Sequence, residues 1–202
     1  GGIWYTAQSG IWQTVWLEPV AKTYVRGISI TPDIDTGTVT VRVDVANPQP
    51  SLMYNVNFGP GIPELKANLN EAAALQIGKP TAKQLWTPDQ PTLQRVEVKL
   101  FGPPARNDNA DNRSPTWSDP VQTYFAWRKI SLGKDAQGGA RMRLNNEPLF
   151  QYGTLDQGWW PDGLYTAPTD EALKFDIEIT KKYGFNMIRK HVKVEPARWY
   201  YW

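Results

Sequence analysis

The chain has 202 residues, and its 22 lysines and arginines against 20 aspartates and glutamates give a net charge of +2. Such a balanced, scattered charge offers no footprint for nucleic acid, and no apolar run nears the roughly 18–20 residues that span a bilayer, so neither partner is expected. The absence of cysteine excludes disulfides and thiolate metal sites, and with His191 as the only histidine a zinc site or a Ser-His triad is hard to assemble. We therefore expect no metal and no cofactor.

The first predicted element is a strand at residues 11–17, IWQTVWL, in which Gln13 and Thr14 interrupt large apolar residues before a proline ends the run. This strand has no partner nearby in sequence. Because a strand that carries Trp12 and Trp16 needs a sheet to join, the pattern indicates that this sheet belongs to a preceding domain.

An antiparallel β-sandwich is predicted from residue 24 to residue 127. The alternation is clearest at Val39, Val41, Val43 and Val45, which fall on one face of a strand, and turn residues separate the strands. The expected strands are VRGISI, DIDTGTVTVRVDVAN, SLMYNVNF, LQRVEVKL and VQTYFAW.

A long polar loop, GPPARNDNADNRSPTWSDP, joins the last two of these strands at residues 102–120. Loops of this length are either functional or mobile. Its tip, RNDNADNR, offers nothing to pack, so we expect it to be mobile.

A strand–helix–strand unit is predicted after Trp127. A hairpin turned at Asn145-Asn146 feeds a strand that ends near Gly153. The helix that follows has Thr169 as N-cap, acidic residues in its first turn, two lysines in its last turn and Gly184 as its stop. Its expected inner face is Leu173, Phe175, Ile177 and Ile179, and the strand FNMIRKH comes next. A helix between two strands predicts a parallel pair.

Pro196, at a helix N1 position, opens a second helical segment, PARWYYW, that ends the sequence. Four adjacent rings, Trp199 to Trp202, have nothing in the sequence to bury them. We therefore expect an internal part of a longer protein, and self-association through the exposed C-terminal segment.

Aromatic residues are abundant, with 10 Trp, 9 Tyr and 6 Phe. Flat rings pack on the apolar faces of sugars, and the N–H or O–H groups of Trp and Tyr bind hydroxyls, so the composition points to carbohydrate. The same rings also fill cores and domain interfaces, and composition alone favours that second explanation.

These motifs together resemble glycoside hydrolase family 2, the group of β-galactosidases, β-glucuronidases and β-mannosidases. They occur in the family's order across nearly the whole chain. The segments that carry the resemblance are SGIWQTVWLEPV, LWTPDQPTL, FAWRKI, LNNEPLFQYG and GFNMIRKH.

The resemblance implies a mainly β fold: an immunoglobulin-like antiparallel β-sandwich followed by an incomplete (β/α)8 barrel. Residues 1–20 would be the last strand of a sugar-binding sandwich, residues 21–128 the immunoglobulin-like domain and residues 129–202 the start of the barrel. The family implies a retaining exo-β-glycosidase, β-galactosidase-like and often outside the cytoplasm, in the periplasm or beyond the cell. Its two catalytic glutamates follow later barrel strands, so no catalytic residue is assigned here and the chain alone is expected to be inactive.

The resemblance also implies sugar-binding residues at the ends of the first two barrel strands, where barrel active sites form. Arg189 matches a family arginine that lines the sugar pocket, although a structural ion pair explains it equally well. His191 stands one place earlier than the family's histidine, and we expect it to contact substrate.

The loop after the first barrel strand departs from the β-galactosidase pattern, so no sugar is specified. We expect Asp156 and Gln157 to bind sugar hydroxyls and Trp159 or Trp160 to stack on the sugar. Packing of the two tryptophans on the sandwich is at least as well supported. A non-catalytic carbohydrate-binding or architectural module is the alternative reading of the chain.

Overall fold

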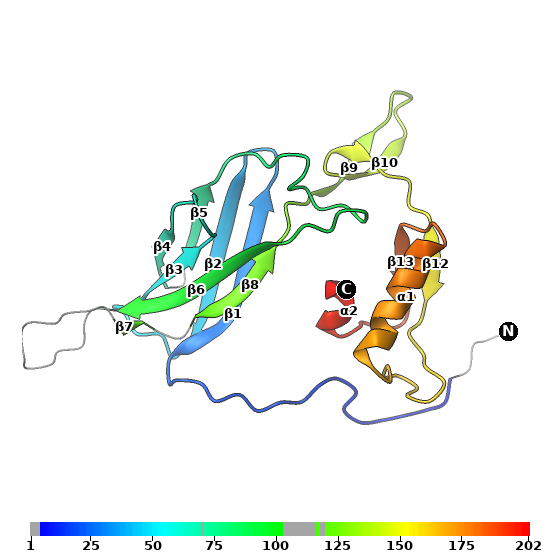
Figure 1. The fold of residues 1–202 in the computed structure, drawn as a ribbon, viewed down its shortest axis with the longest axis horizontal. Coiled ribbons are helices and arrows are strands. Elements are labelled where there is room, and N and C mark those ends of the chain that lie inside the picture. The colour runs from blue at the N-terminus through cyan, green and yellow to red at the C-terminus, as the bar shows by residue number, and fades with distance from the viewer. Residues whose placement is uncertain (1–4, 70, 103–115, 118–119) are drawn as a thin grey trace, which may run out of the picture. The chain divides into compact units, whose positions relative to one another are not determined.

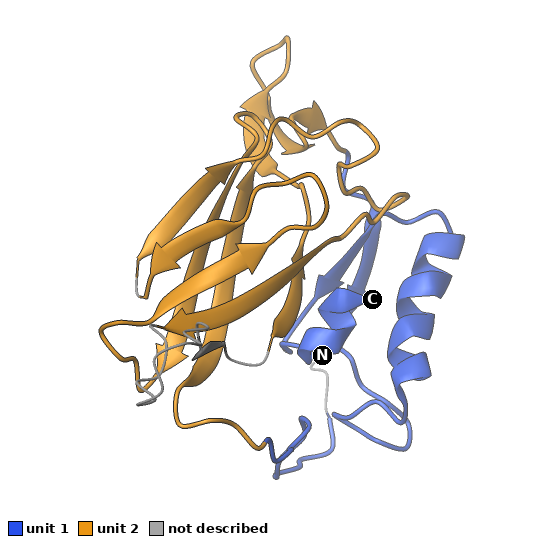
Figure 2. Ribbon diagram, turned by 60° about the vertical axis from the view of Figure 1, so that its left-hand side comes forward, with its two compact units in different colours: residues 1–18, 150–202 blue, residues 19–149 orange. Residues whose placement is uncertain are grey.

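The chain forms two compact units (Figure 2). One consists of Gly1–Glu18 together with Phe150–Trp202, and the other is Pro19–Leu149. The predicted three-domain division is not tested by this partition and stays a prediction. The computed structural model describes residues 5–69, 71–102, 116–117 and 120–202.

Two antiparallel sheets form the β-sandwich of the larger unit (Figure 1). The first has the order β1–β2–β5, and the second has the order β4–β3–β6 with β7 and β8 both paired to β6. The prediction of a mainly β antiparallel sandwich is confirmed. The strands are β1 (Tyr24–Asp33), β2 (Thr38–Ala46), β3 (Met53–Asn57), β4 (Leu65–Asn68), β5 (Ala72–Gln76), β6 (Gln94–Gly102), β7 (Thr116–Trp117) and β8 (Val121–Phe125).

Alternating valines of β2 form the centre of the sandwich core. Val39, Val41, Val43 and Val45 are all buried, as predicted, and they belong to one cluster with Tyr54 of β3 and apolar residues of β6. Burying each such side chain stabilises the fold by about 1.5–3 kcal/mol, so period-two alternation alone sets which face of β2 points inward.

Sequence patterns did not predict β4 and β5. The sequence of β5, AAALQ, has low intrinsic strand propensity. It forms a strand because the edge of β2 supplies hydrogen-bonding partners, with Thr38 opposite Gln76 and Arg42 opposite Ala72. Tertiary pairing here outweighs local preference.

The strand predicted at residues 11–17 is wrong. The segment is irregular, and the side chains of Ile11, Trp16 and Leu17 are exposed. A β-strand exists through hydrogen bonds to a neighbouring strand, and none of the described strands pairs with this segment.

A small antiparallel sheet follows the sandwich, formed by β9 (Ile130–Lys134), β10 (Ala140–Leu144) and β11 (Glu147–Pro148). The predicted turn at Asn145-Asn146 is confirmed, and both asparagines have positive φ, 52° and 72°, which suits a tight hairpin turn. The strand predicted to end near Gly153 instead begins there.

A strand–helix–strand unit occupies the smaller unit, where β12 (Gly153–Asp156) and β13 (Met187–Lys190) run parallel on either side of α1 (Asp170–Lys182) in sequence. This is the predicted start of a (β/α)8 barrel. Parallel neighbours place their carboxyl ends at the same edge, so the loops that follow β12 and β13 meet.

Helix α1 begins and ends where the sequence predicts. The Thr169 hydroxyl accepts a hydrogen bond from Ala172 N at 3.1 Å, and Gly184 has φ +84° just after the last turn. The predicted inner face is partly wrong, because Leu173 is buried but Phe175 is 58% exposed. Along the helix, Phe175 lies about 200° from Leu173, on the opposite side.

The short helix α2 (Ala197–Tyr201) has Pro196 as its N-cap rather than at N1, because Pro196 has extended φ and ψ of −62° and 152°. The expectation of four unburied rings is wrong for Trp199, which is buried, whereas Tyr200 and Trp202 are exposed. Helical periodicity explains the difference, since adjacent helical residues point in different directions.

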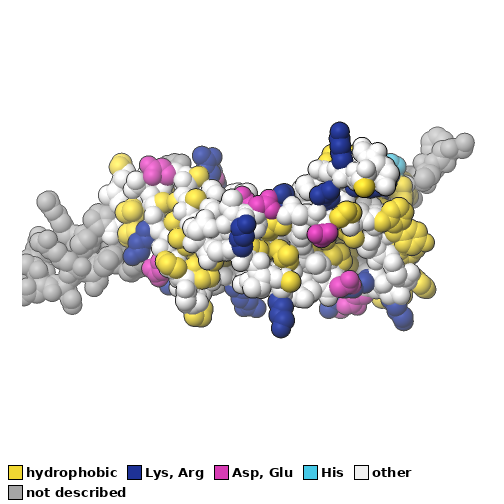
Figure 3. All heavy atoms as spheres, turned by 90° about the horizontal axis from the view of Figure 1, so that it is seen from above, with side chains coloured by type: hydrophobic (Ala, Val, Ile, Leu, Met, Phe, Trp, Pro, Cys, Tyr) yellow, Lys and Arg dark blue, Asp and Glu magenta, His cyan; other side chains and the backbone are white. Residues whose placement is uncertain are grey.

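The surface is charged without a dominant sign. In Figure 3, lysines and arginines alternate with aspartates and glutamates across the face shown. No helix among the described residues is long and apolar enough to cross a membrane. The tip of the loop at residues 102–120, predicted to be mobile, lies outside the described residues.

Candidate functional site

The candidate site lies at the carboxyl ends of β12 and β13. Asp156, the last residue of β12, pairs with Lys190, the last residue of β13, and the backbone N–H of His191 donates to Asp156 O at 2.9 Å. The loop after β12, residues 157–169, therefore starts beside the loop after β13, residues 191–196.

Gln157 and His191 contact each other at this edge. The Gln157 Nε2 atom lies 3.2 Å from His191 Nδ1. The two side chains are therefore within hydrogen-bonding distance, and which of them donates depends on the tautomer of the ring. The structure thus brings together two of the residues predicted to bind sugar.

Asp156 is bound on both carboxylate oxygens by protein groups. Its Oδ1 accepts from Gly158 N at 2.7 Å, and its Oδ2 lies 2.5 Å from Lys190 Nζ. Lys190 Nζ also pairs with Glu195 Oε1 at 2.7 Å. The direct sugar contact predicted for Asp156 remains a prediction, while its internal role in the loop is evident from these bonds.

Lys193 and Glu195 form the buried centre of the site. Their side chains are only 1% and 2% exposed, and Lys193 Nζ lies 3.3 Å from Glu195 Oε2. Lys193 Nζ also donates to the backbone oxygens of Gly158 and Tyr165, each at 2.7 Å. The aromatic rings of Trp12 and Tyr165 lie 5.3 and 4.6 Å from this ammonium, within cation–π range.

Burial perturbs two charged groups here. Burial lowers the pKa of Lys193, and the carboxylate of Glu195 opposes that effect by favouring the ammonium. Burial raises the pKa of Asp176 on α1, and the negative charges of Asp156 and Glu195 raise it further against the opposing effect of Lys190. The site is therefore a network of positively and negatively charged side chains that is largely shielded from solvent.

Trp159 packs on rings of its own unit, and Trp160 is held through its backbone. The Trp159 ring stacks on Tyr5 at 4.2 Å with an interplanar angle of 2°, and meets Tyr165 edge-on at 5.5 Å. Trp160 forms a two-way backbone bridge with Leu164. The predicted stacking of either ring on a sugar remains a prediction.

Three polar atoms of this loop are buried without a hydrogen-bond partner among the described residues: Gln157 Oε1, Trp159 Nε1 and Trp160 Nε1. An unpaired buried polar atom is costly, and such atoms point to a bound water or ligand. One acceptor and two donors of this loop thus lack a partner among the described residues, and all three are shielded from solvent.

Arg189 lies on the opposite face of β13 from Lys190, because successive strand residues alternate. Its side chain is exposed beside Leu155 of β12, which is also exposed, and no described residue forms an ion pair with it. The structural ion pair weighed for Arg189 is thus absent among the described residues, and the sugar contact stays a prediction.

Sequence reasoning missed Lys190, Lys193 and Glu195. Charged residues are almost never fully buried unless paired, so a Lys-x-Glu segment after a strand is typical of a solvated loop. One available signal was that Lys193 and Glu195 alternate in sequence with Val192 and Val194. In the structure the two charged residues are buried and the two valines are exposed, the reverse of the usual order in a half-buried strand.

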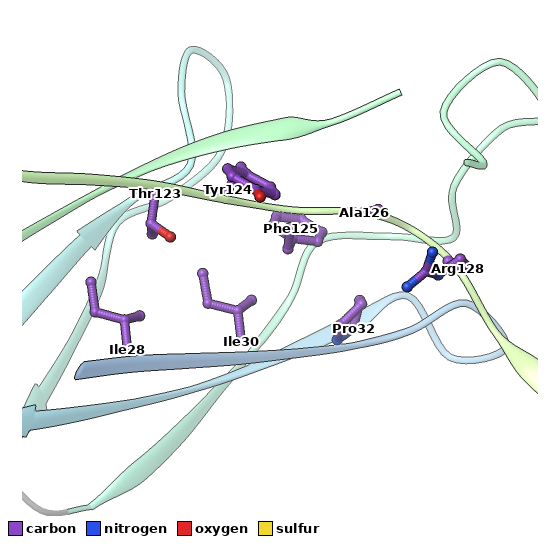
Figure 4. Close-up of a pocket in the computed structure, with 8 residues that line it drawn as sticks. All are labelled: Ile28, Ile30, Pro32, Thr123, Tyr124, Phe125, Ala126 and Arg128. Carbon is purple, nitrogen blue, oxygen red and sulfur yellow. The ribbon is translucent and has the colours of Figure 1, made fainter. Parts of the chain in front are cut away.

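The larger unit also contains hollows, and one of about 510 Å³ is lined by the polar side chains Asn55, Asn57, Glu64, Lys66, Glu97 and Lys99. A hollow of about 370 Å³ opens between β1 and β8 (Figure 4), where Ile28, Ile30 and Pro32 face Thr123 and Phe125. Thr123, Tyr124 and Arg128 add polar groups to its lining. Among the residues that the structure describes, no group of three His, Cys, Asp or Glu side chains could hold a metal ion.

Comparison of sequences adds an independent observation. The chain is 27% identical to a β-galactosidase of Photobacterium profundum, over 95% of this chain and 19% of that protein. It is 25% identical to a β-galactosidase of Lactococcus lactis subsp. lactis, over 95% of this chain and 18% of that protein. The resemblance to glycoside hydrolase family 2 is confirmed. The chain spans about one fifth of the length of these family relatives, and no protein-family profile matches it.

Solved structures of glycosidases share the fold. An FMN-binding β-glucuronidase from Facaelibacterium prausnitzii L2-6 matches with a TM-score of 0.63 at 20% identity, over 90% of this chain and 28% of that chain. A β-glycosidase from Bacteroides vulgatus gives 0.65 at 15% identity, over 90% and 23%. A Ruminococcus gnavus β-glucuronidase in complex with D-glucuronic acid gives 0.64 at 14% identity, over 89% and 28%.

Proposed function

We propose that this chain is part of a retaining exo-β-glycosidase that hydrolyses terminal β-linked sugars, β-galactosides or close relatives. In this proposal the ends of β12 and β13 form the first part of the sugar pocket. The observation that carries the proposal is the contact of Gln157 with His191 at the carboxyl ends of two adjacent parallel strands. Barrel enzymes place their active sites at this end.

The proposed sugar contacts come from both loops. Gln157 Oε1 and the indole N–H groups of Trp159 and Trp160 are buried without a described partner, so they would bind hydroxyls only where the loop opens to admit the sugar, and the His191 ring offers its second nitrogen, Nε2, beyond the contact with Gln157. Arg189 is exposed on the other face of β13, beside Leu155, and its contact with the sugar is the part of the proposal that requires the sugar to reach that face. Asp156 precedes Gln157 in the chain. A direct bond from Asp156 to the sugar requires one of its carboxylate oxygens to release Gly158 N or Lys190 Nζ.

The proposed catalytic carboxylates lie outside these 202 residues. Retaining hydrolysis needs two carboxyl groups about 5–5.5 Å apart that flank the bond, and one of them exchanges protons with the substrate. Glu195 and Asp156 are poor candidates because their carboxylates are bound by buried lysines, and the Glu195 side chain is 2% exposed. The chain by itself is therefore expected to be inactive.

The proposal also includes self-association. Large apolar side chains of the smaller unit are exposed, including Phe150, Phe175 and Val194. Exposed apolar surface of this kind recruits a partner, and a second copy of the chain is the nearest one available.

The test uses the purified chain with aryl β-galactosides and aryl β-glucuronides. We expect no turnover above background, and methyl β-galactoside should perturb the NMR signals of Gln157 and His191. Turnover that is abolished by Glu195→Gln or Asp156→Asn would show that the catalytic carboxylates are in this chain. Inactivity of the chain, together with NMR signals that methyl β-galactoside does not change, would favour a purely architectural module.

A further inference from the structure

The buried ammonium group of Lys193 binds two separate parts of the loop that follows β12. Lys193 Nζ donates to Gly158 O at the start of the loop and to Tyr165 O seven residues later, both at 2.7 Å. The third acceptor is Glu195 Oε2 at 3.3 Å. A lysine ammonium has three donors, so every one is used and none remains for a substrate.

The loop conformation depends on this network at Gly158. Gly158 has φ +66°, and a Cβ added there would lie 2.2 Å from Glu195 Oε1 and 3.0 Å from Lys193 Cδ. The backbone of the loop thus passes directly over the two buried side chains. Lys190 extends the network by joining Glu195 to Asp156, whose other oxygen accepts from Gly158 N.

Gln157 precedes Gly158, and His191 is two residues before Lys193. The network therefore fixes the backbone next to both members of the Gln157–His191 contact. A buried ion pair is expensive to desolvate and adds little net stability compared with apolar packing. Its geometric effect is more specific, since it fixes where two loops lie relative to each other.

We propose that Lys193, paired with Glu195, is a positioning residue that fixes the loop after β12 so that Gln157 and His191 together receive a sugar hydroxyl. Lys193 does not contact the sugar, because its side chain is 1% exposed and its donors are occupied. The inference rests on the proposed function for its sugar, but the placement of the loop can be tested without any sugar.

The experiment compares proton–nitrogen NMR spectra of the full chain carrying Lys193→Met, Glu195→Gln or, as a matched control, Lys174→Met. Lys174 is an exposed lysine of α1 that pairs with Glu178. We expect Lys193→Met to shift the signals of the Gln157 side-chain amide, of the His191 ring and of both indole N–H groups of Trp159 and Trp160. Glu195→Gln keeps an acceptor for Lys193, so it should give smaller shifts in the same direction, and the control should give none.

The outcomes separate the two proposals. If Lys193→Met does not fold, Glu195→Gln decides alone, and wild-type positions of the Gln157 and His191 signals in that variant overturn the inference. Titration with methyl β-galactoside and methyl β-glucuronide should show about tenfold weaker binding when the loop is no longer pre-organised. Failure of the wild-type chain to respond to either sugar overturns the proposed function, while the sugar-free spectra still decide the role of Lys193.

Discussion

Lys193 Nζ lies 3.3 Å from Glu195 Oε2, and both side chains are almost completely buried although they follow a short strand by only a few residues. Each charge has further partners, Lys190 for Glu195 and two carbonyl oxygens for Lys193. Complete pairing of this kind is what makes buried charges tolerable. The stability of the smaller unit is therefore expected to depend on this contact and on the backbone above it.

Replacing Gly158 with alanine should destabilise the smaller unit by about 2–4 kcal/mol, because a left-handed backbone costs a non-glycine residue about 1–2 kcal/mol and the added methyl group would meet Glu195. Gly184→Ala is the matched control, since Gly184 also has positive φ but open space around it. The loss of unfolding free energy in each variant is measured by hydrogen exchange of the amides in α1 and β13 at increasing urea concentration. Equal losses for the two variants would mean that the contact with Glu195 is unimportant.

Thr169→Ala should destabilise α1 by about 1 kcal/mol, because the hydroxyl that accepts from Ala172 N is lost. Thr169→Ser keeps this oxygen and should lose only a few tenths of the stability that Thr169→Ala loses. Thermal unfolding followed by far-ultraviolet circular dichroism makes the comparison. A serine variant as unstable as the alanine variant would argue against the capping role.

Asp176→Asn should stabilise the chain at neutral pH and lose that advantage in acid. The pKa of Asp176 is raised above 3.8, chiefly by burial, so the folded state holds its proton more tightly than the unfolded state. Stability from this group is therefore present below 3.8 and is lost as the pH rises through the raised folded pKa. Denaturant unfolding of both proteins across acid to neutral pH is the measurement. If the stability difference between the wild-type chain and Asp176→Asn does not change with pH, the prediction for Asp176 is wrong.

Phe150→Ser and Val194→Ser should each weaken self-association, because both side chains are exposed and apolar in the smaller unit. Leu132→Ser removes an equally exposed side chain from the larger unit and should leave association unchanged. Sedimentation equilibrium gives the dissociation constants. A monomeric wild-type chain at high concentration would rule out the proposed self-association.

Local sequence signals determined the regular elements correctly where one physical rule dominated. The alternation from Val39 to Val45 placed β2 in a buried sandwich, and Thr169 with Gly184 set both ends of α1. In these cases the side-chain period or the backbone preference of a single residue is enough, whatever lies nearby. The strand–helix–strand order then implied parallel strands and the edge at which the candidate site lies.

Only the tertiary structure decided which charges are buried and which residues pair. The Ala-rich β5 is a strand because β2 offers it an edge, and the segment IWQTVWL is not one because no described strand pairs with it. Lys193 and Glu195 resemble a solvated loop in sequence, yet the carbonyls of Gly158 and Tyr165, 35 and 28 residues from Lys193, supply the partners that make burial possible. Pairing between distant residues leaves no local pattern, so the sequence alone could indicate a candidate edge of the parallel strands but not the buried network beside it.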